Sequence, residues 1–294
     1  MKIALSANPT KPLALDLVRT AIDRLGKGAE LVLSSETHAA LGPTAPDLPH
    51  APLETLRADV LVAIGGDGTF LWSLQRSSLP LLPINAGTLG FLAEVDGTAA
   101  GAFEGALSRL LEGRYLLDPR MRLASQWNGQ NLPDATNEIV VHTSQVAKMR
   151  IFELSVDHRP VGRIRADGVL ISTPTGSTSY SLSALGPIVE PTLEAIVVTA
   201  LAPFQTPQRS LLIDPLRTIG IRLVHPDKDG VVVVDGQNET KLPGGSAVLA
   251  YRSPRPAFFV RFGSRFFRQL QGKRILPWSE EVDAAEDADL SPAP

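Results

Sequence analysis

The stretch that most constrains this chain is an apolar run that ends in three glycines. Val60 to Ile64 consists only of Val, Leu, Ala and Ile, which is typical of a strand buried on both faces of a parallel sheet. Gly65-Gly66-Asp67-Gly68-Thr69 follows at once, and Phe70 to Leu74 is apolar enough to begin a helix. The run therefore predicts a buried strand that turns tightly into a helix.

The composition of this glycine turn, residues 65–69, points to an anionic ligand. Glycine accepts positive φ and lets the backbone approach a ligand closely, and the first N–H groups of a helix have no partner within the helix. Phosphates suit those N–H groups, whereas the carboxylate of Asp67 repels phosphates unless it binds a proton or a metal. An ordinary strand-to-helix turn, where Gly, Asp and Thr are common, is the alternative for these five residues alone.

The first part of the chain alternates strands with helices. Further strands are predicted at residues 2–7, 29–33 and 79–85, and helices from Pro12 onward and over 103–111. Gly87 and Gly90 follow the strand at 79–85, so a parallel sheet would bring them beside the glycine turn. This order predicts an α/β N-terminal domain with a doubly wound, mostly parallel sheet and ligands at the carboxyl ends of the strands.

After about residue 118 the pattern changes to short alternating strands. Asn128-Gly129 is a hairpin turn signal between Met121–Gln126 and Asn137–His142. Further strands are predicted at 149–156, 161–171, 195–201, 218–224, 231–235, 248–251 and 258–262, with one short helix near 177–185. The second half is therefore predicted to be a β-rich C-terminal domain.

These patterns divide the chain into four parts. We expect an α/β nucleotide-binding domain over 1–118, a β-rich domain over 119–256, a segment over 257–278 that packs back on the first domain, and a disordered acidic tail over 279–294. The tail carries Glu280, Glu281, Asp283, Glu286, Asp287 and Asp289 without a basic residue. Without these six, 28 basic residues face 25 acidic ones, which suits a small anionic ligand and not a nucleic-acid partner.

Missing residues and motifs exclude several classes of function. The 294 residues contain no cysteine, which excludes thiol catalysis, disulfides and cysteine-bound zinc, and a cytoplasmic location is the simplest expectation. No apolar run approaches the roughly 20 residues that cross a bilayer, so no membrane partner is expected. The chain also lacks a P-loop, a G-x-G-x-x-G motif and a G-x-S-x-G elbow, and its five histidines show no metal-ligand spacing.

Three further segments place polar side chains at strand ends. Glu138, after Asn137, can hold the vicinal hydroxyls of a sugar as an ionised carboxylate, although a solvated strand end is the commoner explanation. Residues 165–183 carry many hydroxyls around a Pro and a Gly, which suits a polar pocket for adenine and ribose better than a helix cap alone. For Asp235-Gly236-Gln237, a plain hairpin turn and a ligand contact explain the residues equally well.

Together these motifs resemble the NAD kinase family. The matching motifs, in the family's order and spacing over essentially residues 1–278, are Gly65–Thr69, Asn137-Glu138, Arg165-x-Asp167-Gly168, Thr173–Ser183 and Asp235-Gly236-Gln237. The glycine motif is shared with diacylglycerol and sphingosine kinases and their phosphofructokinase relatives, whereas Thr-Pro-Thr-Gly-Ser-Thr is much more specific to NAD kinases. The resemblance implies Mg²⁺-dependent transfer of a phosphoryl group from ATP, or another donor, to the 2′-hydroxyl of the adenosine ribose of NAD, giving NADP.

The resemblance also implies roles for individual residues. Asp67 would be the catalytic carboxylate, and Gly66, Gly68 and Thr69 would bind the phosphates of the donor. NAD would be bound by Asp67, Gly68, Phe91, Asn137, Glu138, Lys148, Arg165, Asp167, Thr175, Thr178, Ser179, Tyr180, Ser181, Leu182, Ser183 and Gln237. NAD and ATP would be the small-molecule partners, further copies of the chain would form a homodimer or homotetramer, and the metal ligands stay unassigned.

Two places depart from the family pattern. Ser179 stands where the family usually has Ala, and Phe204 replaces the His of a Pro-His-x-Leu-x-x-Arg-Pro segment of many bacterial members, in which Arg209 is kept. The second departure concerns the nicotinamide side and the subunit contacts rather than the chemistry. A lipid kinase with the same glycine turn and a non-catalytic NAD-binding regulator are the alternatives. The hydroxyl-rich 172–183 loop argues against the first, and the intact Asp67 argues against the second.

Overall fold

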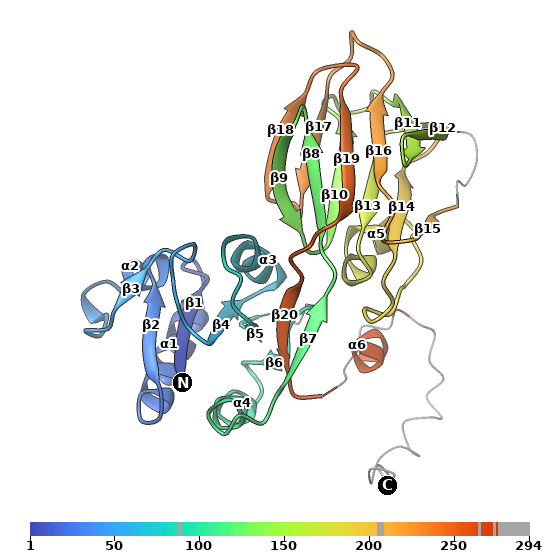
Figure 1. The fold of residues 1–294 in the computed structure, drawn as a ribbon. Helices are drawn as coiled ribbons and strands as arrows, with labels where there is room; N and C mark the ends of the chain where they lie inside the picture. The colour runs from blue at the N-terminus through green and yellow to red at the C-terminus, as the bar shows by residue number, and fades with distance from the viewer. Residues whose placement is uncertain (88–89, 205–208, 264–265, 273–274, 276–294) are drawn as a thin grey trace, which may run out of the picture. The chain divides into compact units, whose positions relative to one another are not determined.

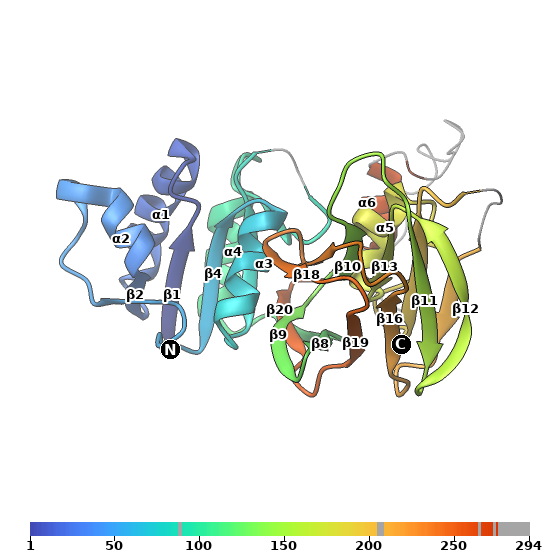
Figure 2. The same ribbon diagram turned by 90° about the horizontal axis from the view of Figure 1, so that it is seen from above.

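The apolar run at 60–65 forms the middle strand of an eight-stranded sheet in this computed structural model (Figures 1 and 2). The strands of this sheet are β1 Lys2–Ala7, β2 Glu30–Ser34, β3 His50–Ala51, β4 Val60–Gly65, β5 Leu81–Asn85, β6 Val95–Asp96, β7 Leu116–Arg120 and β20 Ala257–Arg261. They lie in the order β3-β2-β1-β4-β5-β20-β7, with β6 beside β5. All pairs are parallel except β20 with β7, so the carboxyl ends of β1, β4 and β5 lie at one edge.

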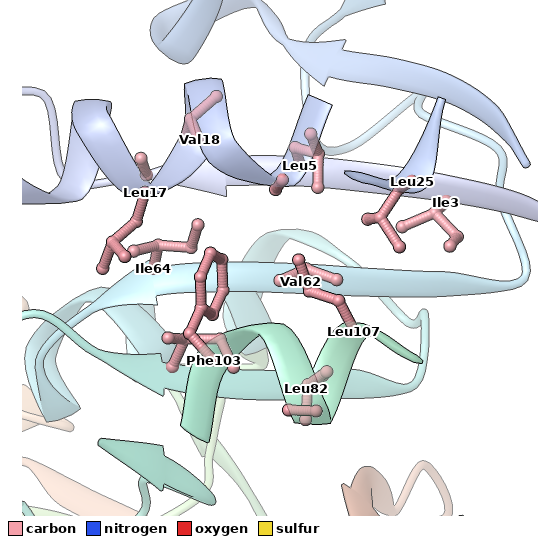
Figure 3. Close-up of a cluster of buried hydrophobic side chains, with 14 of the residues drawn as sticks. Ile3, Leu5, Leu17, Val18, Leu25, Val62, Ile64, Leu82, Phe103 and Leu107 are labelled. Atoms are coloured by element: carbon pink, nitrogen blue, oxygen red, sulfur yellow. The ribbon is translucent and has the colours of Figure 1, made fainter. Parts of the chain in front are cut away.

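Helices cover both faces of this sheet. They are α1 Pro12–Leu25, α2 Ser35–Leu41, α3 Asp67–Arg76 and α4 Ala102–Leu111, with a short 3₁₀ helix over Gly42–Thr44. Side chains of α1 and α4, among them Leu17 and Phe103, pack with Val62 and Ile64 on one face (Figure 3). Phe70 of α3 packs with the alternate residues of β4 on the other face. The predicted doubly wound α/β domain is confirmed.

The second half is a sandwich of two six-stranded antiparallel sheets. Its strands are β8 Leu123–Trp127, β9 Gln130–Ala135, β10 Glu138–Thr143, β11 Arg150–Val156, β12 Arg159–Ala166, β13 Gly168–Ser172, β14 Ile196–Leu201, β15 Leu211–Ile213, β16 Ile219–Leu223, β17 Gly230–Val234, β18 Asn238–Leu242 and β19 Ala247–Arg252. The sheet orders are β15-β14-β13-β10-β17-β18 and β12-β11-β16-β19-β8-β9. Ile139 and Ile171 of the first sheet share one core with Phe152 and Ile221 of the second, so the predicted β-rich domain is also confirmed.

Two strand predictions in this half are wrong in detail. The Asn128-Gly129 turn joins β8 to β9, whereas residues 138–143 belong to the other sheet as β10. Polar residues and Pro133 hide β9 in the sequence, and proline is tolerated there because β9 is an edge strand. The single strand predicted over 161–171 is two strands, β12 and β13, which separate at Asp167 and enter different sheets.

Past residue 256 the chain returns to the first sheet. Phe259 of β20 pairs with Leu81 of β5 and with Asp118 of β7. The chain divides into two compact units: Met1–Phe262, which holds every feature of the site below, and Gly263–Pro294, in which α6 spans Phe266–Gly272.

The structure describes residues 1–87, 90–204, 209–263, 266–272 and 275. The tail predicted at 279–294 lies outside these residues. No helix in the described part is long and apolar enough to cross a membrane.

Candidate active site

The glycine turn is held in shape by Thr69. Gly66 lies between the end of β4 and the start of α3, and Thr69 Oγ1 accepts hydrogen bonds from Gly66 N at 3.5 Å and from Asn8 Nδ2 at 3.4 Å. A Cβ built at Gly65 would lie 2.4 Å from Thr69 Oγ1, so glycine is required at 65. The first turn of α3 therefore follows a buried strand directly, and its free N–H groups favour an anion.

Asp67, the first residue of α3, receives hydrogen bonds from a second loop. Phe91 N donates to Asp67 Oδ2 at 2.9 Å, and Leu92 N donates to Oδ1 at 3.3 Å. Gly90 is packed so closely that a Cβ there would lie 1.9 Å from Asp67 Oδ1. This loop follows β5, the parallel neighbour of β4, as the sequence predicts. Its backbone orients the carboxylate of the glycine turn.

A second polar group lies where β10 begins. Glu138 pairs with Ser172, the last residue of β13, and the chain after β13 folds over Asn137. Thr173 N donates to Asn137 O at 2.9 Å, and a Cβ at Gly176 would lie 2.1 Å from the same carbonyl oxygen. Ser179 Oγ donates to Glu138 Oε1 at 3.3 Å. The hydroxyl-rich segment and the Asn137-Glu138 pair, which the sequence singles out separately, thus form one group.

Several buried polar atoms of this group have no hydrogen-bond partner among the residues that the structure describes. They are Asn137 Oδ1, Glu138 Oε2 and Ser181 Oγ. Buried polar atoms in native proteins are nearly always paired, with protein, water or ligand. Buried acceptor and hydroxyl atoms that have no protein partner among the described residues are suited to bind a polar ligand.

Asp235 holds the start of β10 from the neighbouring strand. Its carboxylate oxygens accept hydrogen bonds from the backbone N–H groups of Thr136, Asn137 and Glu138 at 2.8, 2.8 and 3.0 Å. Burial raises the pKa of Asp235, whereas these three N–H donors and the nearby Arg122 guanidinium oppose that rise. Asp235 and Gly236 have positive φ in the turn from β17 to β18, so residues 235–237 form a hairpin turn, one of the two explanations that the sequence leaves open.

Glu138 differs from the ionised carboxylate that the sequence suggests. Burial, and then the charge of Asp235, raise the pKa of Glu138 to about 8, against the smaller opposing effect of the Ser179 hydroxyl. At neutral pH the carboxyl group is therefore mostly protonated, and it offers one O–H donor besides its acceptor oxygens.

The hairpin at 235–237 connects this group to the glycine turn. Gln237 Nε2 donates to Gly68 O at 2.9 Å, and next to it Asn238 Nδ2 donates to Gln75 Oε1 of α3 at 2.6 Å. One short turn thus contacts the glycine turn through Gln237 and the start of β10 through Asp235. The two polar groups lie on either side of this hairpin.

The remaining predicted residues divide between two places. Thr175, Thr178, Ser179, Tyr180, Ser181, Leu182 and Ser183 lie together on the 3₁₀ helix Thr175–Thr178 and on α5, Tyr180–Ser183. Asp167 and Arg165 precede the opposite end of β13, about 13 Å away along the strand at 3.3 Å per residue. Arg165 stacks on Phe204, 4.3 Å from the ring centre, and lines a cavity of about 680 Å³ with Lys148. The structure therefore does not bring Lys148, Arg165 and Asp167 to Glu138 within one chain.

Two residues near the site are absent from the sequence prediction. The sequence motif of Asp235 indicates no role for its carboxylate, because the N–H groups that it binds are about 100 positions away in the chain. Lys11 was not singled out at all, although it follows the strand at 2–7 at the same sheet edge. Its place after a strand parallel to the central one was the available signal.

Comparisons with known proteins match both halves of the chain. The family described as ATP-NAD kinase N-terminal domain matches residues 48–115, and the ATP-NAD kinase C-terminal domain matches residues 136–262. The NAD kinase of Thermoplasma volcanium is 34% identical over 275 residues, which cover 94% of this chain and 98% of that protein.

Two solved structures resemble this one. An NAD kinase from Archaeoglobus fulgidus in complex with ATP has a TM-score of 0.73 at 30% identity, over 93% of this chain and 98% of that chain. Yeast NADH kinase complexed with NADH has a TM-score of 0.83 over 93% of this chain and 88% of that chain. At 23% identity, the second likeness is one of fold.

Proposed function

This chain belongs to the NAD kinase family and phosphorylates NAD to NADP with ATP, and we propose which of its residues carry each part of that reaction. The observation that carries the proposal is the position of Asp67. It begins α3 in a glycine turn and is oriented by two backbone N–H groups. The hairpin that touches this turn also holds Asn137 and Glu138.

Asp67 accepts the proton of the attacking ribose hydroxyl. The 2′-oxygen of NAD forms a bond to the terminal phosphorus of ATP, the bond from that phosphorus to the bridging oxygen breaks, and ADP leaves. Meanwhile the hydroxyl proton passes to the Asp67 carboxylate. A positioned base of this kind typically contributes about 10²–10⁴-fold in rate. Gly66, Gly68 and Thr69 contact the donor phosphates at the start of α3, where the helix N-terminus favours an anion.

Mg²⁺ fits these residues. No group of three His, Asp or Glu side chains is placed to hold a metal within the described part of the chain. Mg²⁺ does not need one, because it is usually bound through one or two carboxylates, substrate phosphates and water. Asp67 and the donor phosphates would hold the ion, which supplies neutralisation of phosphate charge when bound.

NAD is bound by the polar group at the start of β10. The support is the set of buried atoms without a partner among the described residues, on Asn137, Glu138 and Ser181, together with the hydroxyls of 175–183 and with Phe91 and Gln237 beside the glycine turn. A protonated Glu138 donates one hydrogen bond and accepts others, which matches a ribose or an amide.

We further propose that the chain works as a homo-oligomer. Lys148, Arg165 and Asp167 match the family's ligand contacts but lie at the far end of β13 from Glu138. They would contact bound NAD if that end of β13 faced the NAD-binding site of a second copy of the chain. A cytoplasmic location stays a prediction from the cysteine-free sequence.

Formation of NADP tests the function. The purified chain is incubated with NAD, Mg²⁺ and either ATP or inorganic polyphosphate, and NADP is measured with an NADP-specific dehydrogenase. We expect NADP with ATP and none when the donor or NAD is omitted. Absence of NADP with both donors, from protein that melts cooperatively, would overturn the function.

A further inference from the structure

Lys11 lies at the same sheet edge as the glycine turn. It is the residue before α1, which follows β1, and β1 pairs in parallel with β4. Asn8 ties the two turns together, because its Oδ1 accepts from Thr10 N at 3.0 Å while its Nδ2 donates to Thr69 Oγ1. The segment 8–11 is therefore fixed against the glycine turn.

The ammonium group of Lys11 is placed over two glycines. A Cβ built at Gly66 would lie 3.7 Å from Lys11 Nζ, and one built at Gly87 would lie 3.2 Å from it. Gly87 has a φ of 152°, a conformation that other residues rarely adopt. Lys11 Nζ thus lies between the turn after β4 and the turn after β5, close to the backbone of both.

The ammonium group retains hydrogen-bonding capacity in this position. It has three N–H donors, and the hydrogen bond that it forms within the described residues is a long one, 3.4 Å to Ala86 O. Lys11 forms no salt bridge to any carboxylate of the described part of the chain. A half-buried lysine that pairs with a carboxylate would have a structural role. Lys11 has no such pair among the described residues.

A cation is needed here for electrostatic reasons. The phosphates of a donor carry several negative charges, and besides the Mg²⁺ described above the start of α3 offers only about half of one positive charge in compensation. Asp67 adds a negative charge to the same turn. Lys11 Nζ, near Gly66 at the beginning of α3, is placed to offset both.

We propose that Lys11 is a catalytic residue that contacts the phosphate chain of the donor and offsets its charge as the terminal phosphoryl group leaves. The proposal depends on the phosphoryl transfer proposed above. Asp67 takes the hydroxyl proton, and Lys11 contacts only the phosphate oxygens. ATP and inorganic polyphosphate share the recognised chemistry, a chain of phosphates.

Two substitutions separate this role from a structural one. Lys11→Gln removes the charge but keeps an N–H donor for Ala86 O, and Lys11→Arg keeps the charge. Lys27→Met removes a charge from an exposed lysine beyond the far end of α1, and it controls for net charge. If Lys11 only held Ala86, Lys11→Gln would lower the melting temperature without a selective loss of phosphate affinity.

Binding of ATP, inorganic tripolyphosphate and NAD is measured by calorimetry for the parent and each variant. Lys11→Gln should weaken the binding of ATP and of tripolyphosphate by about 10–100-fold, as expected for the loss of one charge-assisted contact. It should change the affinity for NAD by less than about twofold. A loss for ATP alone would mean that Lys11 contacts the nucleoside, which contradicts the proposal. Lys27→Met should stay close to the parent, and Lys11→Arg, which keeps the charge, should bind tripolyphosphate more tightly than Lys11→Gln does.

Steady-state kinetics separate this proposal from the function on which it depends. With the parent active, Lys11→Gln should raise the KM for ATP and lower kcat, with the KM for NAD unchanged. If the parent forms NADP and Lys11→Gln binds tripolyphosphate as tightly as the parent, the Lys11 assignment is wrong and the function stands. If the parent forms no NADP but Lys11→Gln still binds tripolyphosphate more weakly than the parent, the proposed function is wrong and the phosphate contact stands.

Discussion

Glu138 and Asp235 show how a buried polar pair is divided between two tasks. The carboxylate oxygens of Asp235 accept hydrogen bonds from three backbone N–H groups and so fix the start of β10. Glu138 keeps Oε2 without a partner among the described residues and is held by Ser179 through Oε1. The hydroxyl of Ser179, where the family usually has Ala, therefore orients the carboxyl group of Glu138.

Glu138→Gln should change how stability depends on pH. The folded protein holds a proton on Glu138 between its ordinary pKa of 4.5 and its raised pKa of about 8, whereas the unfolded chain does not. This group's contribution to the unfolding free energy is therefore complete below about pH 4.5 and is lost as pH rises through about 8. Gln cannot ionise, so the variant should lose less stability than the parent as pH rises.

Melting temperatures at about pH 6 and pH 9 measure this difference, since about 1 kcal/mol corresponds to roughly 2–4 °C for a chain of this size. We expect the parent to fall several degrees further than Glu138→Gln. Glu239→Gln, at an exposed position on β18, is the control and should follow the parent. Equal pH dependence of Glu138→Gln and the parent would show that the carboxyl group is not protonated in the folded state.

At the scale of elements, the site depends on two parallel strands that end side by side. β4 and β5 pair from Leu61 with Leu81 to Gly65 with Asn85, so the turn after one strand meets the turn after the other. Gly90 makes that contact possible, because any side chain at this position would overlap the Asp67 carboxylate. The Asp67 carboxylate is thus oriented by backbone N–H groups of the neighbouring loop.

Gly90→Ala should therefore lower kcat without unfolding the protein. A Cβ 1.9 Å from Asp67 Oδ1 forces the carboxylate or the loop to move, and a misplacement of about 1 Å can cost about 10²-fold in rate. Gly105→Ala on α4, where a Cβ meets nothing within 4 Å, is the matched control and should keep full activity. If Gly90→Ala retains the parent's kcat, the loop does not orient Asp67.

The elements themselves were predictable wherever the side-chain pattern was strong. Buried parallel strands such as β4 and the helix from Pro12 follow directly from their apolar residues. β9 was hidden because its residues are polar, and the break at Asp167 is hidden because polar Asp167 continues the alternation at the end of β12, whereas β13 after it is buried throughout. Lys11 was missed because its significance depends on which strands are neighbours, and single-sequence patterns do not give strand order.

At the scale of the whole molecule, the residues expected to bind NAD divide into two clusters. Asn137 and Glu138 lie at one end of the β10–β13 pair, and Arg165 and Asp167 precede the other end. Sequence likeness alone cannot reveal this separation, because a motif gives no distance between its members. A homo-oligomer in which each site draws on two copies would account for both clusters.

Mixing two defective variants tests that arrangement. Arg165→Ala should weaken NAD binding by about tenfold, the loss of one charge-assisted contact, and Asp67→Asn should be nearly inactive. After the two are unfolded and refolded together, a mixed oligomer contains one site with an intact Asp67 and a neighbouring intact Arg165. NAD affinity should then recover in part. If it stays at the level of Arg165→Ala alone, Arg165 does not serve a neighbouring copy.

The central claim is that Asp67 takes the proton of the ribose hydroxyl, and the turnover of Asp67→Asn tests it most directly. The substitution keeps the size of the side chain and one oxygen acceptor but removes the base. We expect kcat for NADP formation at saturating ATP and NAD to fall by about 10²–10⁴-fold, roughly 3–5 kcal/mol of barrier, with NAD affinity and melting temperature nearly unchanged. Turnover within a few-fold of the parent would contradict the assignment of Asp67.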